Sequence, residues 1–197
     1  MAHRISVMLR NFIQNNLDLS EEQIIIVQYC FEQLISKLLF VIFLLFFGII
    51  TKRYLISIIY LCTIIPLRTL GGGAHASTKR QCILLSYGIS IFIIFFTPYI
   101  SEIINRQQLI IIYFLCLIIS IYFAPVDTKN KRLDTKKSNS LRGKFRVLSI
   151  ILTIIYLLMC YYDIKNPVTT ITIAVILFTL SLIVGIIQNR RDTYNAI

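Results

Sequence analysis

The sequence predicts an all-α, polytopic integral membrane protein with about six transmembrane or partly re-entrant helices. Hydrophobic residues make up 57% of the chain, and the mean hydropathy is +0.78. They occur in long blocks rather than in the periodic stripes of a soluble helix, and a soluble domain of this length would need more polar surface. We expect residues 1–197 to form a single membrane-embedded domain.

The N-terminal region, residues 1–33, is polar enough to lie on the membrane surface before the first span. Ser20 is a suitable helix cap with Gln23 three residues later, and the mixed apolar faces that follow fit an interfacial helix. A simple surface anchor is the other interpretation. The first residues lack an apolar core and a small-residue cleavage site, so we expect no removable signal peptide.

Six apolar segments follow, at residues 34–51, 54–66, 83–100, 109–125, 147–162 and 168–187. A helix that crosses the hydrocarbon needs about 20 residues, and at least about 17. The second segment is short because Pro66 interrupts it. It either continues as a helix through residue 70, or ends inside the membrane and leaves the following turn partly submerged.

The distribution of positive charge predicts the orientation in the cell membrane. The connections on one side carry most of the cations, and those on the other carry only Lys52, Arg53, Arg106 and Lys165. The positive-inside rule then places both termini and the connection after residue 66 in the cytoplasm. The Lys52–Arg53 pair fits poorly, since it would lie in a tight external hairpin. The net charge of +11 is expected to reflect this orientation and contact with membrane lipids, not a nucleic-acid partner.

Residues 126–146 are predicted to be a basic cytoplasmic loop. Its many lysines and arginines are balanced only by Asp127 and Asp134. The segment is too polar and too short to fold alone.

Residues 67–82 form the predicted catalytic turn, because they combine Arg68, Gly71, Gly72, Gly73, His75 and Cys82. The five cysteines of the chain show no C-x-x-C or zinc-like spacing, and Cys82 alone has cationic neighbours and a nearby histidine. Only one other histidine occurs, so we expect neither a metal site nor a cofactor.

These residue types suit acyl chemistry through a thiol. Cys82 is the candidate nucleophile and His75 the candidate base, the three glycines allow backbone N–H groups to face an oxyanion, and Arg68 can hold a carboxylate or carbonyl oxygen. The non-catalytic alternative is that the histidine only ends a turn and that the cysteine packs as a small apolar side chain.

The spacing of the pair restricts its geometry. Residues seven apart on one straight helix lie about 10 Å apart along the axis, which is too far for a hydrogen bond. The pair therefore needs a helix that starts between the two residues, capped by Ser77 or Thr78, or pairing between two subunits. At such a helix start, beside Lys79 and Arg80, the thiolate form of Cys82 would be favoured.

The chain resembles the accessory gene regulator protein B (AgrB) family, the membrane cysteine endopeptidases of Gram-positive quorum sensing. The resemblance lies in Arg68-x-x-x-Gly72-Gly73-x-His75 followed by Cys82 at the start of a span. The stretch Ala124-Pro125-Val126-Asp127 with the basic residues after it is similar to the second pattern of the family. Length, six segments and cytoplasmic termini also match. One departure is Arg132-Leu133, where the family often has a proline.

The resemblance implies an activity and a partner. The enzyme would remove the acidic C-terminal tail of an autoinducer propeptide through a thioester on Cys82, with His75 as base, and promote closure of a lactone or thiolactone macrocycle. Asp127 is a candidate third catalytic member, although a dyad with a backbone or amide partner is equally open. Lys129, Lys131 and Arg132 are candidate contacts of the acidic tail; topology and lipid contact explain them as well.

Two other functions fit the same residues. In a small transporter or channel the glycine turn would be a broken helix at a binding site, but such proteins usually carry intramembrane charges, and the spans contain almost none. A Cys82-dependent acyltransferase would label with acyl-CoA and ignore propeptide. A homodimer is a candidate assembly, although no motif specifies one.

Overall fold

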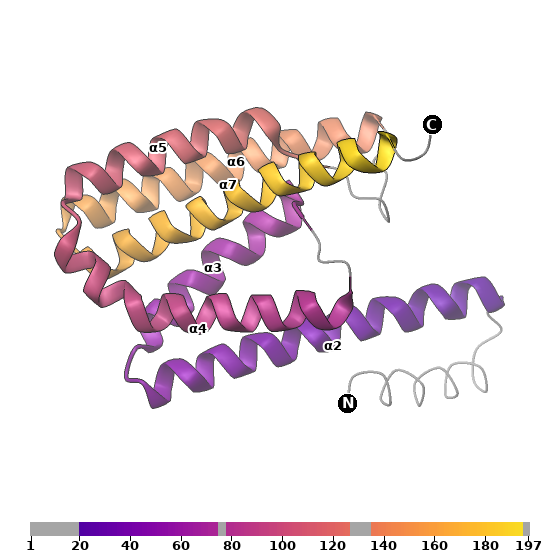
Figure 1. The fold of residues 1–197 in the computed structure, drawn as a ribbon, viewed down its shortest axis with the longest axis horizontal. Helices are drawn as coiled ribbons and strands as arrows, with labels where there is room; N and C mark the ends of the chain where they lie inside the picture. The colour runs from indigo at the N-terminus through magenta and orange to yellow at the C-terminus, as the bar shows by residue number, and fades with distance from the viewer. Residues whose placement is uncertain (1–19, 75–77, 127–134, 195–197) are drawn as a thin grey trace. The chain divides into compact units, whose positions relative to one another are not determined.

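The computed structural model describes residues 20–74, 78–126 and 135–194, and six α-helices form its framework (Figure 1). They are α2 (Glu21–Ile50), α3 (Tyr54–Gly71), α4 (Lys79–Ile103), α5 (Arg106–Phe123), α6 (Thr135–Tyr161) and α7 (Lys165–Tyr194). Each contains a stretch that is long and apolar enough to cross a membrane. The prediction of an all-α protein with six such helices is therefore confirmed.

Helix α2 begins where the sequence predicts a cap. The Ser20 N–H donates to Gln23 Oε1 over 3.1 Å, and the Gln23 N–H donates to Ser20 Oγ over 3.4 Å. These reciprocal bonds satisfy two of the donors that a helix start leaves unpaired. From there α2 is continuous to Ile50, so the described part of the N-terminal region and the first span form one helix. Residues 1–19 lie outside the described ranges.

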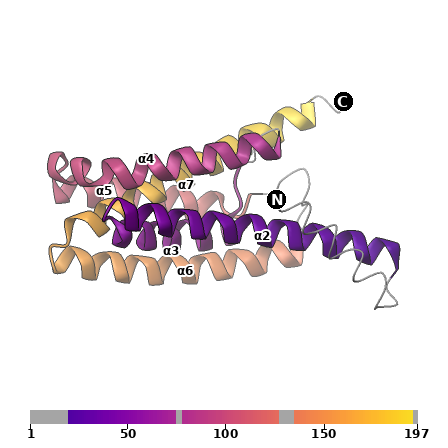
Figure 2. The same ribbon diagram turned by 90° about the horizontal axis from the view of Figure 1, so that it is seen from below.

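The chain divides into two units, residues 1–47 and 48–197. The second unit contains the helices of the candidate site. Within this unit α7 is central, because it contacts each of α3, α4, α5 and α6. In Figure 2, α6 runs along the bottom of the view, and α4 crosses in front of α7 along the top. Buried side chains recur along α7 every three or four residues, at Val168, Ile171, Val175, Phe178 and Leu182. This spacing is typical of a helix packed against several neighbours.

Hydroxyl groups join the helices inside the bundle. Thr179 of α7 bonds Ser120 of α5 over 2.8 Å, and Tyr156 of α6 bonds Thr172 of α7 over 3.1 Å. The ring of Tyr156 also stacks on that of Tyr113 at a centroid distance of 3.9 Å. Between membrane helices such bonds contribute about 0.6 to 2 kcal/mol each. Because hydroxyls bond only at particular heights, they also fix the register of α7.

Helices α3 to α7 alternate in direction, so their connections gather at two ends (Figure 1). We call the site end the one at which α3, α5 and α7 finish and α4 and α6 start. Helix α6 begins at Thr135, so residues 135–146 are helical where the sequence predicted a loop. Helix α3 runs through Pro66 to Gly71, an 18-residue helix of about 27 Å. The second segment therefore continues beyond Pro66, the first of the two alternatives.

Arg53 lies at the other end and binds α4 at a proline. Pro98 lies inside α4 and has no N–H for the Ile94 carbonyl one turn earlier. Arg53 Nη1 donates to the Ile94 oxygen over 3.1 Å and also to the Phe95 oxygen. Its guanidinium carbon lies 5.0 Å from the ring centroid of Phe95. The cation that seemed out of place in a tight hairpin thus satisfies a carbonyl that proline leaves unpaired.

Replacing Arg53 with methionine is expected to destabilise the fold by about 2 to 4 kcal/mol, because charged hydrogen bonds and a cation–π contact are lost together. The measurement is the free energy of unfolding in mixed micelles titrated with dodecyl sulfate. Lys52→Met is the matched control, since it removes a neighbouring cation whose side chain is exposed. Equal stability of the two variants would contradict this role of Arg53.

Candidate active site

The site begins at the end of α3, where two glycines turn the chain away. Gly72 has φ 74° and Gly73 has φ 125°, values that side chains disfavour. The Gly72 N–H donates to the Arg68 carbonyl over 3.1 Å and closes the helix. Gly71, the last residue of α3, is buried, and a Cβ there would collide with the ring of Phe178. We call residues 71–74 the glycine turn.

The glycine turn pairs with the segment that follows α5. The Val126 N–H donates to the Gly71 carbonyl over 3.0 Å, and Gly72 and Val126 form an isolated parallel bridge. A Cβ on Gly72 would lie 2.5 Å from the Val126 carbonyl oxygen. The two sequence patterns, Arg68 to His75 and Ala124 to Asp127, therefore meet at one place in the fold.

Helix α7 also binds the turn. The Ala74 N–H donates to the Ser181 carbonyl over 2.8 Å, and Arg68 Nη2 donates to Ser181 Oγ over 2.7 Å. Arg68 is exposed and keeps further N–H donors. Arg142 of α6 reaches the same region, because its Nε donates to the Ala124 carbonyl over 3.4 Å. Sequence analysis missed Ser181 and Arg142, since no local pattern marks a residue that acts through a distant contact.

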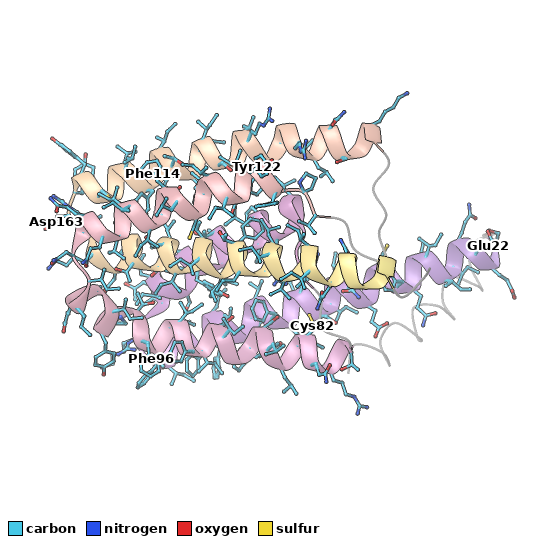
Figure 3. The ribbon with its side chains drawn as sticks, turned by 45° about the horizontal axis from the view of Figure 1, so that its top comes forward. Glu22, Cys82, Phe96, Phe114, Tyr122 and Asp163 are labelled. Carbon is cyan, nitrogen blue, oxygen red and sulfur yellow. The ribbon has the colours of Figure 1, made fainter. Side chains whose placement is uncertain are left out.

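Cys82 is the fourth residue of α4, which starts at the site end. Thr78 caps this helix: its side chain accepts a bond from the Gln81 N–H over 3.3 Å. Its carbonyl accepts one from the Cys82 N–H over 3.1 Å. The expected cap between residues 75 and 82 is thus present, at Thr78. Figure 3 shows the Cys82 side chain on the first turns of α4, where it is half-buried.

The described residues bring some of the predicted site together. Arg68, Gly71, Gly72 and Gly73 are held with Val126 and Ser181. Ala74 and Thr78 are four positions apart in the chain, so they lie at most about 14 Å apart, and α4 starts near the glycine turn. The remaining predicted residues, His75, Asp127, Lys129, Lys131 and Arg132, lie outside the described ranges. Pairing of Cys82 with His75 therefore stays a prediction.

Comparisons with known proteins agree on one family. The sequence pattern of the family described as "Accessory gene regulator B" matches residues 6–188. An AgrB-like protein of Clostridium perfringens strain SM101 is 30% identical over 98% of both chains. A second one, from strain 13, is 32% identical over 83% of this chain and 80% of its own. An AgrB-like protein of Clostridium beijerinckii is 27% identical over 92% of this chain and 89% of its own.

No solved structure matches the chain significantly. The family pattern nonetheless spans the whole described part of the chain apart from the last six residues of α7, and it includes every residue of the glycine turn and Cys82. A match of this length covers both the helices and the residues of the candidate site. The chain therefore belongs to the accessory gene regulator B family.

Proposed function

We propose that this protein is a membrane cysteine endopeptidase that removes the acidic tail of an autoinducer propeptide and promotes macrocycle formation. Membership of a family that processes autoinducing peptides supports the substrate class. The observation that carries the mechanism is the glycine turn, which is bonded to Val126 and Ser181 and is followed four residues later by Thr78, the cap of the helix that bears Cys82. This places a thiol at a helix start near a rigid, polar backbone.

The first step is acyl transfer to sulfur. His75 takes the proton of the Cys82 thiol, and the thiolate attacks the carbonyl carbon between the signal segment and the acidic tail. When the tetrahedral intermediate collapses, the C–N bond breaks and the imidazolium of His75 gives its proton to the leaving amine. The tail departs, and the signal segment remains as a thioester on Cys82. Asp127 is the candidate that orients His75.

The oxyanion of this step needs donors that are not already used. The Gly72 N–H bonds the Arg68 carbonyl and the Ala74 N–H bonds the Ser181 carbonyl, while Gly71 belongs to α3. The Gly73 N–H makes no backbone hydrogen bond to any residue that the structure describes. We assign the Gly73 N–H and the Arg68 guanidinium as the donors to the oxyanion. Of the three glycines, only Gly73 then donates, whereas the sequence suggested that all three could.

The second step closes the ring. A side-chain thiol or hydroxyl of the signal segment gives its proton to His75 and attacks the thioester carbonyl. The carbon–sulfur bond to Cys82 breaks, and a thiolactone or lactone forms. Water must be kept from the thioester meanwhile, which suits a site at the membrane boundary.

We propose that the site end faces the cytoplasm. At the opposite end two of the cations are already engaged: Arg53 bonds carbonyls of α4, and Arg106 bonds the Cys160 carbonyl over 2.9 Å and pairs with Asp163. The exposed cations Arg80, Lys136, Arg142 and Lys144 lie toward the site end. By the positive-inside rule this favours a cytoplasmic site end, where Lys129, Lys131 and Arg132 can meet an acidic tail.

The test uses the full chain in liposomes with a synthetic propeptide from the same operon. We expect release of the free tail and an adduct of the signal segment on the peptide that contains Cys82. Hydroxylamine should remove the adduct, as it does other thioesters, and both species are measured by mass spectrometry. Acylation of Cys82 by acyl-CoA with no response to propeptide would replace this function by lipid transfer, and tail release without a thioester would overturn the covalent mechanism.

A further inference from the structure

Ser181 of α7 binds the candidate site at two points, although 113 residues separate it from Arg68. Its hydroxyl accepts the bond from the Arg68 guanidinium, at 2.7 Å. Its main-chain carbonyl accepts the bond from the Ala74 N–H, at 2.8 Å. One residue of α7 therefore fixes both the cation at the end of α3 and the far end of the glycine turn.

Gly185 lies one turn further along α7, and its missing side chain makes this approach feasible. A Cβ at residue 185 would lie 3.0 Å from the Ala74 nitrogen, 3.1 Å from the Gly73 carbonyl carbon and 3.3 Å from Val126 Cγ1. Side chains of a helix lean toward its N-terminus, so a side chain at 185 would cover the Ser181 carbonyl. Glycine leaves that carbonyl open to a second donor.

The glycine turn is equally close from its own side. A Cβ on Gly73 would lie 2.6 Å from Ser181 Oγ, and Gly185 itself is buried. Around Gly73 and Ala74 the contact with α7 is thus made by backbone atoms and by the short side chain of Ser181. Such a contact tolerates little displacement, because these groups have few rotations with which to adjust.

We propose that Ser181 and Gly185 are positioning residues, which form a docking platform on α7 for the glycine turn and for Arg68. This inference rests on the proposed function, in which Arg68 and the Gly73 N–H stabilise the oxyanion. Arginine has several rotatable bonds, and ordering them before the substrate arrives lowers the cost of reaching the transition state. Ser181 orders Arg68 while leaving its other N–H donors to the substrate.

The kinetic test compares variants of the full chain in liposomes with synthetic propeptide. We expect Ser181→Ala to lower kcat about tenfold with KM within about twofold, since the lost interaction acts in the transition state. In an Arg68→Gln background the same change should lower kcat less than about twofold, because the two residues act as a unit. We expect Gly185→Ala to lower kcat by a similar factor by shifting the turn.

Two control variants separate positioning from general weakening of the bundle. Thr179→Val removes another α7 hydroxyl, the one bonded to Ser120, without touching the turn. Gly88→Ala adds a methyl group on α4, where nothing lies within 4 Å. Both should keep the kcat of the natural chain. Equal losses of kcat in Ser181→Ala and Thr179→Val, or full additivity with Arg68→Gln, would overturn the proposal.

Tryptic cleavage after Lys79 or Arg80 supplies a readout that needs no propeptide. We expect it to be faster in Ser181→Ala and Gly185→Ala than in the natural chain and the two controls, because an undocked turn loosens the start of α4. If the natural chain processes no propeptide but this cleavage pattern holds, the proposed function fails and the platform stands. If processing and cleavage are unchanged in both variants, the platform fails and the proposed function stands.

Discussion

Cys82→Ala is expected to lose at least about a thousandfold in the rate of tail release, since removing the nucleophile of a covalent mechanism leaves only binding and oxyanion donors. The variant should still fold. The hydrogen bond between the Cys82 N–H and Thr78 is made by the backbone, and the side chain is only half-buried. The measurement is tail release per inserted protein in liposomes, followed by mass spectrometry. Cys82→Ser, which keeps the shape but not the thiolate, should be nearly as slow.

Cys62→Ala is the matched control for this loss. Cys62 is an exposed thiol on α3, the helix that leads into the glycine turn, so its removal tests whether the loss of any thiol from the bundle slows tail release. We expect it to keep the rate of the natural chain. Tail release by Cys82→Ala at that same rate, in protein with normal helix content, would remove Cys82 from the mechanism.

Gly72→Ala is expected to lower tail release about a hundredfold, because displacement of a site by about 1 Å has effects of that size. An alanine at φ 74° costs about 1 to 3 kcal/mol in the backbone alone. Its Cβ would in addition lie 2.5 Å from the Val126 carbonyl oxygen, a backbone atom that cannot rotate away. The turn and the segment after α5 must therefore separate, which displaces the Gly73 N–H and the Arg68 guanidinium.

Insertion and helicity show whether the effect of Gly72→Ala is local. We expect circular dichroism and membrane yield close to those of the natural chain, since Gly72 lies outside the helices. Gly143→Ala is the control, because a methyl group at this position of α6 meets nothing within 4 Å. If the rate of tail release by Gly72→Ala lay within about threefold of that of the control, the position of the turn would not matter for the reaction. That result would contradict the prediction, because oriented catalytic groups are usually sensitive to displacement.

The sequence predicted those features that depend on neighbouring residues. Blocks of apolar residues located the six helices, and the Ser20–Gln23 spacing located the start of α2. The polar residues before Cys82 gave Ser77 or Thr78 as the cap of α4, and the structure has Thr78. Each is a local effect of hydrophobicity or of side chains that bond nearby backbone. The Arg68 to Cys82 pattern likewise singled out the turn, because its residues are close in sequence.

The features that depend on packing could not be predicted in this way. The hydrogen bond lost at Pro66 does not by itself decide whether α3 ends there. The contacts around the proline decide whether the helix continues. The helical start of α6 at Thr135 contradicts its polar composition, which suggested a loop. Ser181 and Gly185 looked like ordinary residues of an apolar span. Their contacts with Arg68 and the glycine turn join residues more than a hundred positions apart.

The central position of α7 has a consequence for biosynthesis. The glycine turn and Cys82 leave the ribosome well before Ser181 and Gly185, and α7 is the last of the six helices to be made. Until α7 is in place, the turn and Arg68 lack their hydrogen bonds to Ser181. On the proposed mechanism, a nascent chain carries Cys82 beside an undocked turn, and we expect no reaction with propeptide until α7 is in place.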